Sequence, residues 1–301
     1  MSQINRRQFL RNTAVAAAGT ALLAGSLPSA FAAATKRTAT DQVTLGKSGV
    51  KLSRLGIGTG ANNGQLSLAA GKEAFTKLIH HAFDSGITYI DCAERYQTFP
   101  YIADAIKGLP REKLFIQSKV PGNPTDVLAA IDHHRKVLNT DYIDSLLIHL
   151  MTDEKWTDTY KRVMDGFNEA KEKKWISAKG VSCHTIGALR TAAASDWTEV
   201  HLVRFNPLGR YMDGEKDVWS RNVSADLNPI LEQVKTMSAK GHGVIGMKIF
   251  GNGDIKSPED REKSLRFALS HQELNALVIG FTAPEQVDDS IKMINSILAE
   301  A

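Results

Sequence analysis

Short apolar runs alternate along the chain with longer segments whose apolar residues recur at the spacing of an amphipathic helix. The predicted strands are residues 54–59, 89–90, 114–118, 143–148, 178–182, 200–205, 244–248 and 276–280. The predicted helices are residues 72–85, 101–107, 125–138, 156–174, 186–194, 229–239, 258–270 and 284–299. Eight strands, each followed by a helix, predict an α/β fold in which a closed parallel (β/α)8 barrel, the TIM barrel, forms one domain over residues 43–301. Within that domain, residues 43–53 alternate around Gly46 and Gly49 and predict a β-hairpin ahead of the first barrel strand.

A second fold competes with the barrel. The stretch from Gly56 to Ala61 fits the glycine pattern of a dinucleotide-binding domain, with Asp91 as its ribose-binding acid. However, residues 62–71 predict a loop where that fold needs a helix. Asp91 also follows the glycines by about thirty residues, whereas about twenty is usual. The glycines are better explained by close approach of a ligand or backbone at a barrel strand end.

Polar residues stand at the ends of successive strands, where a TIM barrel carries its chemistry. Asp91 ends the second strand, Lys119 follows the third, His149 follows the fourth, and Tyr96 lies in the loop after Asp91. Taken singly, each has an ordinary interpretation as a packed tyrosine, a solvated lysine or one half of a salt bridge. Their coincidence at neighbouring strand ends instead predicts a catalytic cluster.

This cluster resembles the tetrad of the aldo-keto reductase family, with Asp91, Tyr96, Lys119 and His149 in the family's order. The resemblance runs from about Val43 to the C-terminus. It implies that the hairpin closes the bottom of the barrel. It also implies reduction of aldehydes or ketones, or the reverse oxidation of alcohols, with a nicotinamide cofactor and a small carbonyl or alcohol substrate.

Carbonyl reduction needs a proton as well as the hydride that a nicotinamide supplies. A tyrosine with a pKa of about 10 is a reluctant donor near neutral pH, and a nearby cation lowers that pKa. The resemblance therefore makes Tyr96 the proton donor and Lys119 its cationic neighbour. Asp91 would hold Lys119, and His149 would orient the carbonyl oxygen.

The resemblance also points to cofactor-binding positions at the strand ends and in the loops after strands 7 and 8. They are Gly58, Thr59, Ser182, Cys183, Phe205, Lys248, Gly251, Gly280 and Gln286. Ser182 and Cys183 align with a Ser-Asn pair that holds the carboxamide, and Phe205 aligns with a tyrosine that stacks on the nicotinamide ring. NADP(H) is expected over NAD(H), although Gly280, Phe281 and Gln286 replace the family's 2′-phosphate contacts. Trp156 and Phe99 are candidates for lining the substrate pocket.

The first residues predict an export signal rather than part of the fold. Arg6 and Arg7 stand in a context that resembles a twin-arginine (Tat) signal, followed by an Ala/Leu-rich run and the small-x-small pattern of Ala30 to Ala32. The alternative is an uncleaved amphipathic or anchoring helix, but the run is short and interrupted. Residues 1–32 would therefore be removed by the Tat route, residues 33–42 would form a linker, and the protein would be periplasmic without a stable membrane anchor.

Charge and cysteine content narrow the choice of function. The net charge is +4, and three of those charges are arginines of the signal, so the mature chain carries +1 and offers no basic stripe for nucleic acid. Cys92 and Cys183 are too few for a disulfide framework, and their spacing with His149 and His184 fits no familiar zinc pattern.

Two other functions remain open, a non-catalytic periplasmic barrel that binds a small ligand or partner and a metal-dependent hydrolase. The sequence does not fix the oligomeric state.

Overall fold

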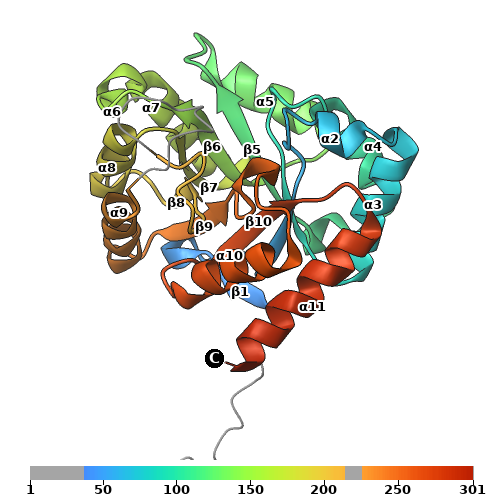
Figure 1. The fold of residues 1–301 in the computed structure, drawn as a ribbon. Helices are drawn as coiled ribbons and strands as arrows, with labels where there is room; N and C mark the ends of the chain where they lie inside the picture. The colour runs from blue at the N-terminus through green and yellow to red at the C-terminus, as the bar shows by residue number, and fades with distance from the viewer. Residues whose placement is uncertain (1–36, 214–225, 301) are drawn as a thin grey trace, which may run out of the picture. The chain divides into compact units, whose positions relative to one another are not determined.

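The computed structural model describes residues 37–213 and 226–300. Within them, eight parallel strands close into a barrel in the order β10-β3-β4-β5-β6-β7-β8-β9, with helices around it (Figure 1). The strands are β3 (Leu55–Gly58), β4 (Tyr89–Asp91), β5 (Phe115–Pro121), β6 (Ile143–Met151), β7 (Ile176–Cys183), β8 (Val200–Arg204), β9 (Gly243–Met247) and β10 (Ala276–Gly280). The predicted (β/α)8 barrel is confirmed.

The helices lie close to their predicted positions. They are α2 (Gln65–Leu68), α3 (Lys72–Asp84), α4 (Ile102–Ala105), α5 (Val127–Val137), α6 (Trp156–Thr159), α7 (Lys161–Glu172), α8 (Ile186–Ala194), α9 (Asn228–Ala239), α10 (Pro258–Ser270) and α11 (Pro284–Glu300). Three predictions were wrong in detail. Residues 62–71 include the short helix α2, the helix predicted over 101–107 shrinks to one turn, and the helix over 156–174 divides at Tyr160 into α6 and α7.

Strand alternation divides the apolar residues into two cores. One set fills the barrel interior and includes Tyr89, Phe115 and Leu147, while a larger set lies between the strands and the helices. The predicted hairpin consists of β1 (Gln42–Thr44) and β2 (Lys51–Ser53), which pair antiparallel. Its Leu45 and Leu52 are fully buried in the interior set. The hairpin therefore closes one end of the barrel and leaves the carboxyl ends of the strands for the site.

The segment predicted as a linker, residues 33–42, is part of the barrel unit from its described residues onward. The described residues from Arg37 onward belong to one compact unit. Ala39 is fully buried, its backbone N–H donates to Asn295 Oδ1 at 2.7 Å, and its carbonyl accepts from the Leu55 N–H at 2.8 Å. The linker prediction was therefore wrong for residues 37–42. The predicted signal, residues 1–32, lies outside the described part of the chain.

Candidate active site

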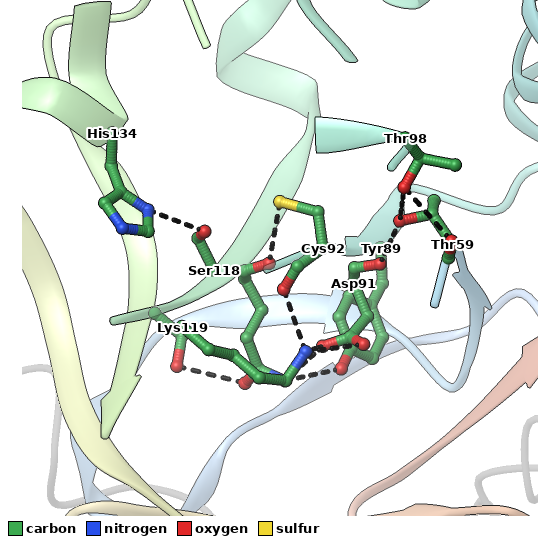
Figure 2. A network of polar contacts seen from close by, with 10 residues as sticks. Thr59, Tyr89, Asp91, Cys92, Thr98, Ser118, Lys119 and His134 are labelled. Carbon is green, nitrogen blue, oxygen red and sulfur yellow. Dashed lines mark hydrogen bonds and ion pairs between the residues drawn. The ribbon is translucent and has the colours of Figure 1, made fainter. Parts of the chain in front are cut away.

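A buried ion pair joins β4 and β5 at the carboxyl end of the barrel. Lys119 Nζ donates to Asp91 Oδ1 at 2.7 Å and to Asp91 Oδ2 at 2.8 Å, and it also donates to the Cys92 carbonyl at 2.8 Å (Figure 2). The two side chains are 1% and 7% exposed. Since an ammonium has three donors, all three are used and the charge stays compensated by the carboxylate.

The strand register explains how residues 28 positions apart in sequence meet. Asp91 pairs with Gln117 in the parallel β4–β5 ladder, and Lys119 lies two residues beyond Gln117 on the same, inward face. Gln117 Nε2 donates to Asp91 Oδ1 at 2.9 Å and to the Tyr89 hydroxyl at 2.8 Å. Gln117, which the sequence analysis did not single out, therefore fixes the carboxylate from below.

Tyr96 is held over this ion pair by the loop after β4. The Lys119 ammonium lies 5.0 Å from the centroid of the Tyr96 ring, and the His149 ring meets it edge-on at 5.7 Å. The loop is anchored below Tyr96, because the Thr98 hydroxyl donates to the Thr59 carbonyl at 3.1 Å (Figure 2). The structure thus brings the four predicted tetrad residues together.

The charge environment of Tyr96 differs from the expectation that Lys119 lowers its pKa below the usual value. Desolvation raises the pKa of the Tyr96 phenol, and the Asp91 carboxylate raises it further. Lys119 acts in the opposite direction but does not outweigh burial, so the net shift is upward. Tyr96 is therefore held protonated, and Lys119 acts by stabilising the tyrosinate that would remain after proton transfer.

His149 is a neutral imidazole in this setting. Burial lowers its pKa well below the usual value, and the positive charges of Lys119 and Arg95 lower it further. Its Nδ1 atom is buried and has no hydrogen-bond partner among the described residues. A neutral imidazole still has one N–H to donate, so His149 can hold a carbonyl oxygen without adding charge.

A cavity of about 720 Å³ opens in front of Tyr96 and His149. Backbone strain is concentrated around it, since six of the eight described non-glycine residues with positive φ line this cavity. These six are Asn62, Asn63, Leu150, Tyr211, Lys248 and Asn252. Such conformations are unfavourable for residues with a Cβ and gather at functional sites. We call this space the Tyr96 cavity.

A smaller cavity of about 190 Å³ adjoins it between the ends of β3, β9 and β10. Gly58, Gly280 and Lys248 line it, together with Gly253 and Arg261. Burial lowers the pKa of Lys248 to about 8, and the Arg204 charge contributes in the same direction. A lysine among glycines after the last strands of a barrel is suited to bind phosphate.

The residues present fit a nicotinamide cofactor in part. Ser182 lines the Tyr96 cavity, and its hydroxyl is buried without a partner among the described residues, which leaves it available to a carboxamide. Gly58 and Gly280 leave the ends of β3 and β10 without side chains where they line the smaller cavity. A Cβ on Gly280 would meet the Ala61 Cβ at 3.2 Å. Lys248 reaches both cavities.

Other predicted cofactor residues do not line either cavity. The aromatic ring of Phe205 stacks on Phe267 of α10 at 5.0 Å and meets His271 edge-on at 5.1 Å, so Phe205 faces the helices and cannot stack on a nicotinamide. Cys183 likewise belongs to the core between strands and helices, where burial raises its pKa well above the usual value. The physical reason is alternation, because both residues stand one position out of phase with the inward-facing residues of their strands.

The remaining three predicted cofactor residues, Thr59, Gly251 and Gln286, line neither cavity. Thr59 is fully buried, and its hydroxyl donates to the Asp91 carbonyl at 3.0 Å (Figure 2). Gly251 is buried with φ of 55°, a conformation that shapes the loop after β9. Gln286 Oε1 accepts from the Thr282 N–H at 2.9 Å, and Gln286 lines a groove between α10 and α11 that shares Arg261 and Gly280 with the smaller cavity. The predicted direct cofactor roles of Thr59 and Gly251 are therefore not supported by the cavity linings.

Sequence reasoning missed Met247 and Tyr211. Met247 ends β9 and lines both cavities, and Tyr211 presents its ring to the Tyr96 cavity with the Lys248 ammonium 5.1 Å from the ring centroid. The signal for Met247 was available, since it continues the inward set of β9 with Ile245. Tyr211 lies in an irregular loop, which has no hydrophobic periodicity from which the direction of its side chain could be predicted. Trp156 and Phe99, expected at the pocket, are buried in the core instead.

The described residues offer no metal centre. No group of three or more His, Cys, Asp or Glu side chains in residues 37–213 and 226–300 is arranged to hold a metal ion. Cys92 and Cys183 are both free and buried. In the same part of the chain no helix combines the length and apolar character that crossing a bilayer requires.

Comparison with known proteins places this arrangement in a family of reductases. The model of the Aldo/keto reductase family matches residues 54–265, well over half of the sequence. The chain therefore belongs to the aldo-keto reductase family. Membership supports carbonyl reduction with a nicotinamide cofactor.

Individual relatives are distant. The NAD/NADP-dependent indole-3-acetaldehyde reductase of Schizosaccharomyces pombe is 38% identical over 73 residues, which is 24% of this chain and 26% of that protein. Glyoxal reductase of Bacillus subtilis is 28% identical over 256 residues, 71% of this chain and 88% of that protein. The chain thus spans about a quarter of the length of the first relative. Among solved structures, an aldo-keto reductase from Klebsiella pneumoniae in complex with NADPH has a TM-score of 0.63 at 17% identity, covering 85% of this chain and 89% of that chain. That likeness shows the fold alone.

Proposed function

We propose that this protein reduces aldehydes or ketones to alcohols, and oxidises the corresponding alcohols in reverse, with Tyr96 as the proton donor. The observation that carries the proposal is the geometry around one phenol. Tyr96 lies beside the Lys119 ammonium, which is itself held by Asp91, and its ring meets the neutral His149 edge-on at the wall of the Tyr96 cavity. A cofactor, when bound, supplies the hydride.

The protein's own residues supply the remaining chemistry. The His149 imidazole donates a hydrogen bond to the carbonyl oxygen and orients it toward Tyr96. As negative charge develops on that oxygen, the Tyr96 hydroxyl gives up its proton. The Lys119 ammonium then stabilises the tyrosinate, which regains a proton from water in each cycle. Because Asp91 binds Lys119 from the opposite side, the ammonium does not move away when the charge forms.

The residues toward the cofactor are Ser182, Lys248, Gly58 and Gly280. The Ser182 hydroxyl would accept or donate a hydrogen bond to the carboxamide, and Lys248 would meet a phosphate. We further propose a preference for NADP(H) over NAD(H), supported by a second cation, Arg261, in the smaller cavity. The Klebsiella pneumoniae structure of similar fold holds NADPH.

Export is part of the proposal. The twin-arginine pattern at Arg6 and Arg7 and the small residues at Ala30 to Ala32 support removal of residues 1–32 and a periplasmic location. N-terminal sequencing of the protein from its native host should then begin near Ala33. Full-length protein found only in the cytosol would contradict export and leave the reductase chemistry untouched.

The experiment that tests the reductase proposal is a parallel titration of the purified protein with NADPH and NADH, followed by nicotinamide fluorescence. We expect both to bind, NADPH more tightly, and NADPH to be consumed when an aldehyde is added. A folded protein that binds neither would instead be a non-catalytic barrel that binds some other ligand or partner.

A further inference from the structure

Arg95, the residue before Tyr96, is a cation at the rim of the Tyr96 cavity that the proposed reaction does not use. Its side chain is exposed, and it lines the cavity together with Tyr96 and His149. None of the carboxylates in the described part of the chain forms an ion pair with it, whereas Arg54, Arg111, Arg135, Arg204 and Arg266 each have such a partner. A cation left without an internal partner beside a reacting centre is available to a ligand.

The acid next to Arg95 in sequence is bound elsewhere. Glu94 Oε2 accepts from His134 Nε2 of α5 at 3.1 Å, and His134 Nδ1 in turn contacts the Ser118 hydroxyl at 2.9 Å (Figure 2 shows the His134–Ser118 contact). His134 is fully buried, so this chain of contacts fixes Glu94 toward α5. The Glu94 carboxylate is therefore bound by His134, and among the described residues it forms no ion pair with Arg95.

The other described residues of the cavity wall reinforce this positive character. Arg95 and Lys248 are its two cationic residues, and no described residue that lines it carries a carboxylate. The nearby acid, Asp91, lines only the smaller cavity and is compensated by Lys119. The positive field reaches the reacting centre, since Arg95 is one of the charges that depress the pKa of His149. Asn62, Asn63 and Asn252 add amides that can donate hydrogen bonds.

From this arrangement we infer that the preferred substrates are carbonyl compounds that also carry a carboxylate, with Arg95 binding the carboxylate while Tyr96 and His149 hold the carbonyl. The inference rests on the proposed reductase function and adds the class of substrate. An arginine is suited to the task because its planar guanidinium binds a carboxylate through two parallel hydrogen bonds. The cavity volume of about 720 Å³ can hold a small acid beside a nicotinamide ring.

The first test compares two aldehydes of equal chain length that differ in charge, succinic semialdehyde and butanal. Wild-type protein should show kcat/KM at least about tenfold higher for the anionic aldehyde, as expected when one charge-assisted contact is gained. Arg95→Gln should remove that preference mainly through a higher KM for succinic semialdehyde, so that its kcat/KM falls to about that for butanal. Arg95→Lys should restore part of it. Arg190→Gln, at an exposed arginine of α8 that does not line the cavity, is the matched control and should change neither rate.

A second measurement separates this inference from the reductase proposal. Calorimetric titration with benzoate and its neutral analogue benzamide, with and without saturating NADPH, reports binding without turnover. We expect benzoate to bind at least about tenfold more tightly than benzamide, and Arg95→Gln to abolish the difference. Benzoate binding that depends on Arg95 would support the anion site even if no aldehyde were reduced.

Two results would overturn the inference. One is equal binding and equal kcat/KM for the charged and neutral ligands in the wild type. The other is an Arg95→Gln variant that loses NADPH affinity while its preference between aldehydes is unchanged, because Arg95 would then serve the phosphates of the cofactor. Either result leaves the reductase proposal standing if butanal is still reduced.

Discussion

Gly60 lies directly against the ring of Tyr96. A Cβ added to Gly60 would come within 2.3 Å of Tyr96 Cε2 and Cζ and within 2.8 Å of its hydroxyl oxygen. No side chain fits between them, so the loop after β3 determines where the phenol can lie. Glycine is required here because any Cβ would clash with the Tyr96 ring, and not because the backbone adopts a positive φ.

Gly60→Ala should therefore displace Tyr96 from Lys119 without unfolding the barrel. We expect turnover of a reactive aldehyde to fall by about 10²-fold, as when a positioned acid is lost, with thermal stability changed little. Gly187→Ala on α8 is the control, because its Cβ would meet only the Glu154 side chain, with Cβ at 3.2 Å and Oε2 at 3.4 Å, and alanine favours the helix. Full activity in Gly60→Ala would mean that the position of the Tyr96 ring is not critical.

Tyr96→Phe tests the proton donor itself. The substitution keeps the ring against Gly60 and removes the hydroxyl, so single-turnover reduction should slow by roughly 10²-fold or more. Cofactor affinity, measured by fluorescence, should barely change. If Tyr96→Phe reduces aldehydes at the wild-type rate, the proton comes from another group.

Lys119→Met should affect stability as well as activity. It leaves the Asp91 carboxylate buried without its cation, and breaking such a pair costs about 3–5 kcal/mol of unfolding free energy. Asp91→Asn in the same chain removes the stranded charge, so the double variant should recover much of that stability in urea unfolding. Activity should stay low in the double variant, because the ammonium beside Tyr96 is still missing. Equal stability of Lys119→Met and the double variant would show that the charges are not coupled.

Cofactor affinity should depend on pH through Lys248. Its lowered pKa of about 8 means that it is cationic below that value and neutral above it. The Kd for NADPH should therefore rise by up to about tenfold from pH 7 to pH 9, as one charge-assisted contact with phosphate is lost. Lys248→Arg keeps its charge throughout this range and should give a nearly constant Kd. A constant Kd in the wild type would mean that Lys248 does not meet a phosphate.

Much of the barrel was determined by local sequence pattern. The order of strands and helices was read correctly because an apolar period near 3.6 and short apolar runs are local properties of the chain. Helices α8 and α10 and strand β10 were predicted to the residue. The four tetrad residues could also be predicted. Polar residues at the carboxyl ends of barrel strands lie at the face of the barrel where active sites form.

Only the tertiary structure decided which residues face the site and how their charges balance. Phe205 and Cys183 stand at strand ends but face the helices, since a shift of one residue reverses the direction of a side chain in a strand. Burial and Asp91 raise the pKa of Tyr96 against the effect of Lys119, a balance of distances that no linear pattern contains. Glu94 is bound to His134 of α5, 40 residues away, and Arg95 at the cavity rim has no ion pair with a described carboxylate. Residues near in sequence are thereby separated and distant ones joined, because packing of the strands and helices, and not chain order, sets which charges meet.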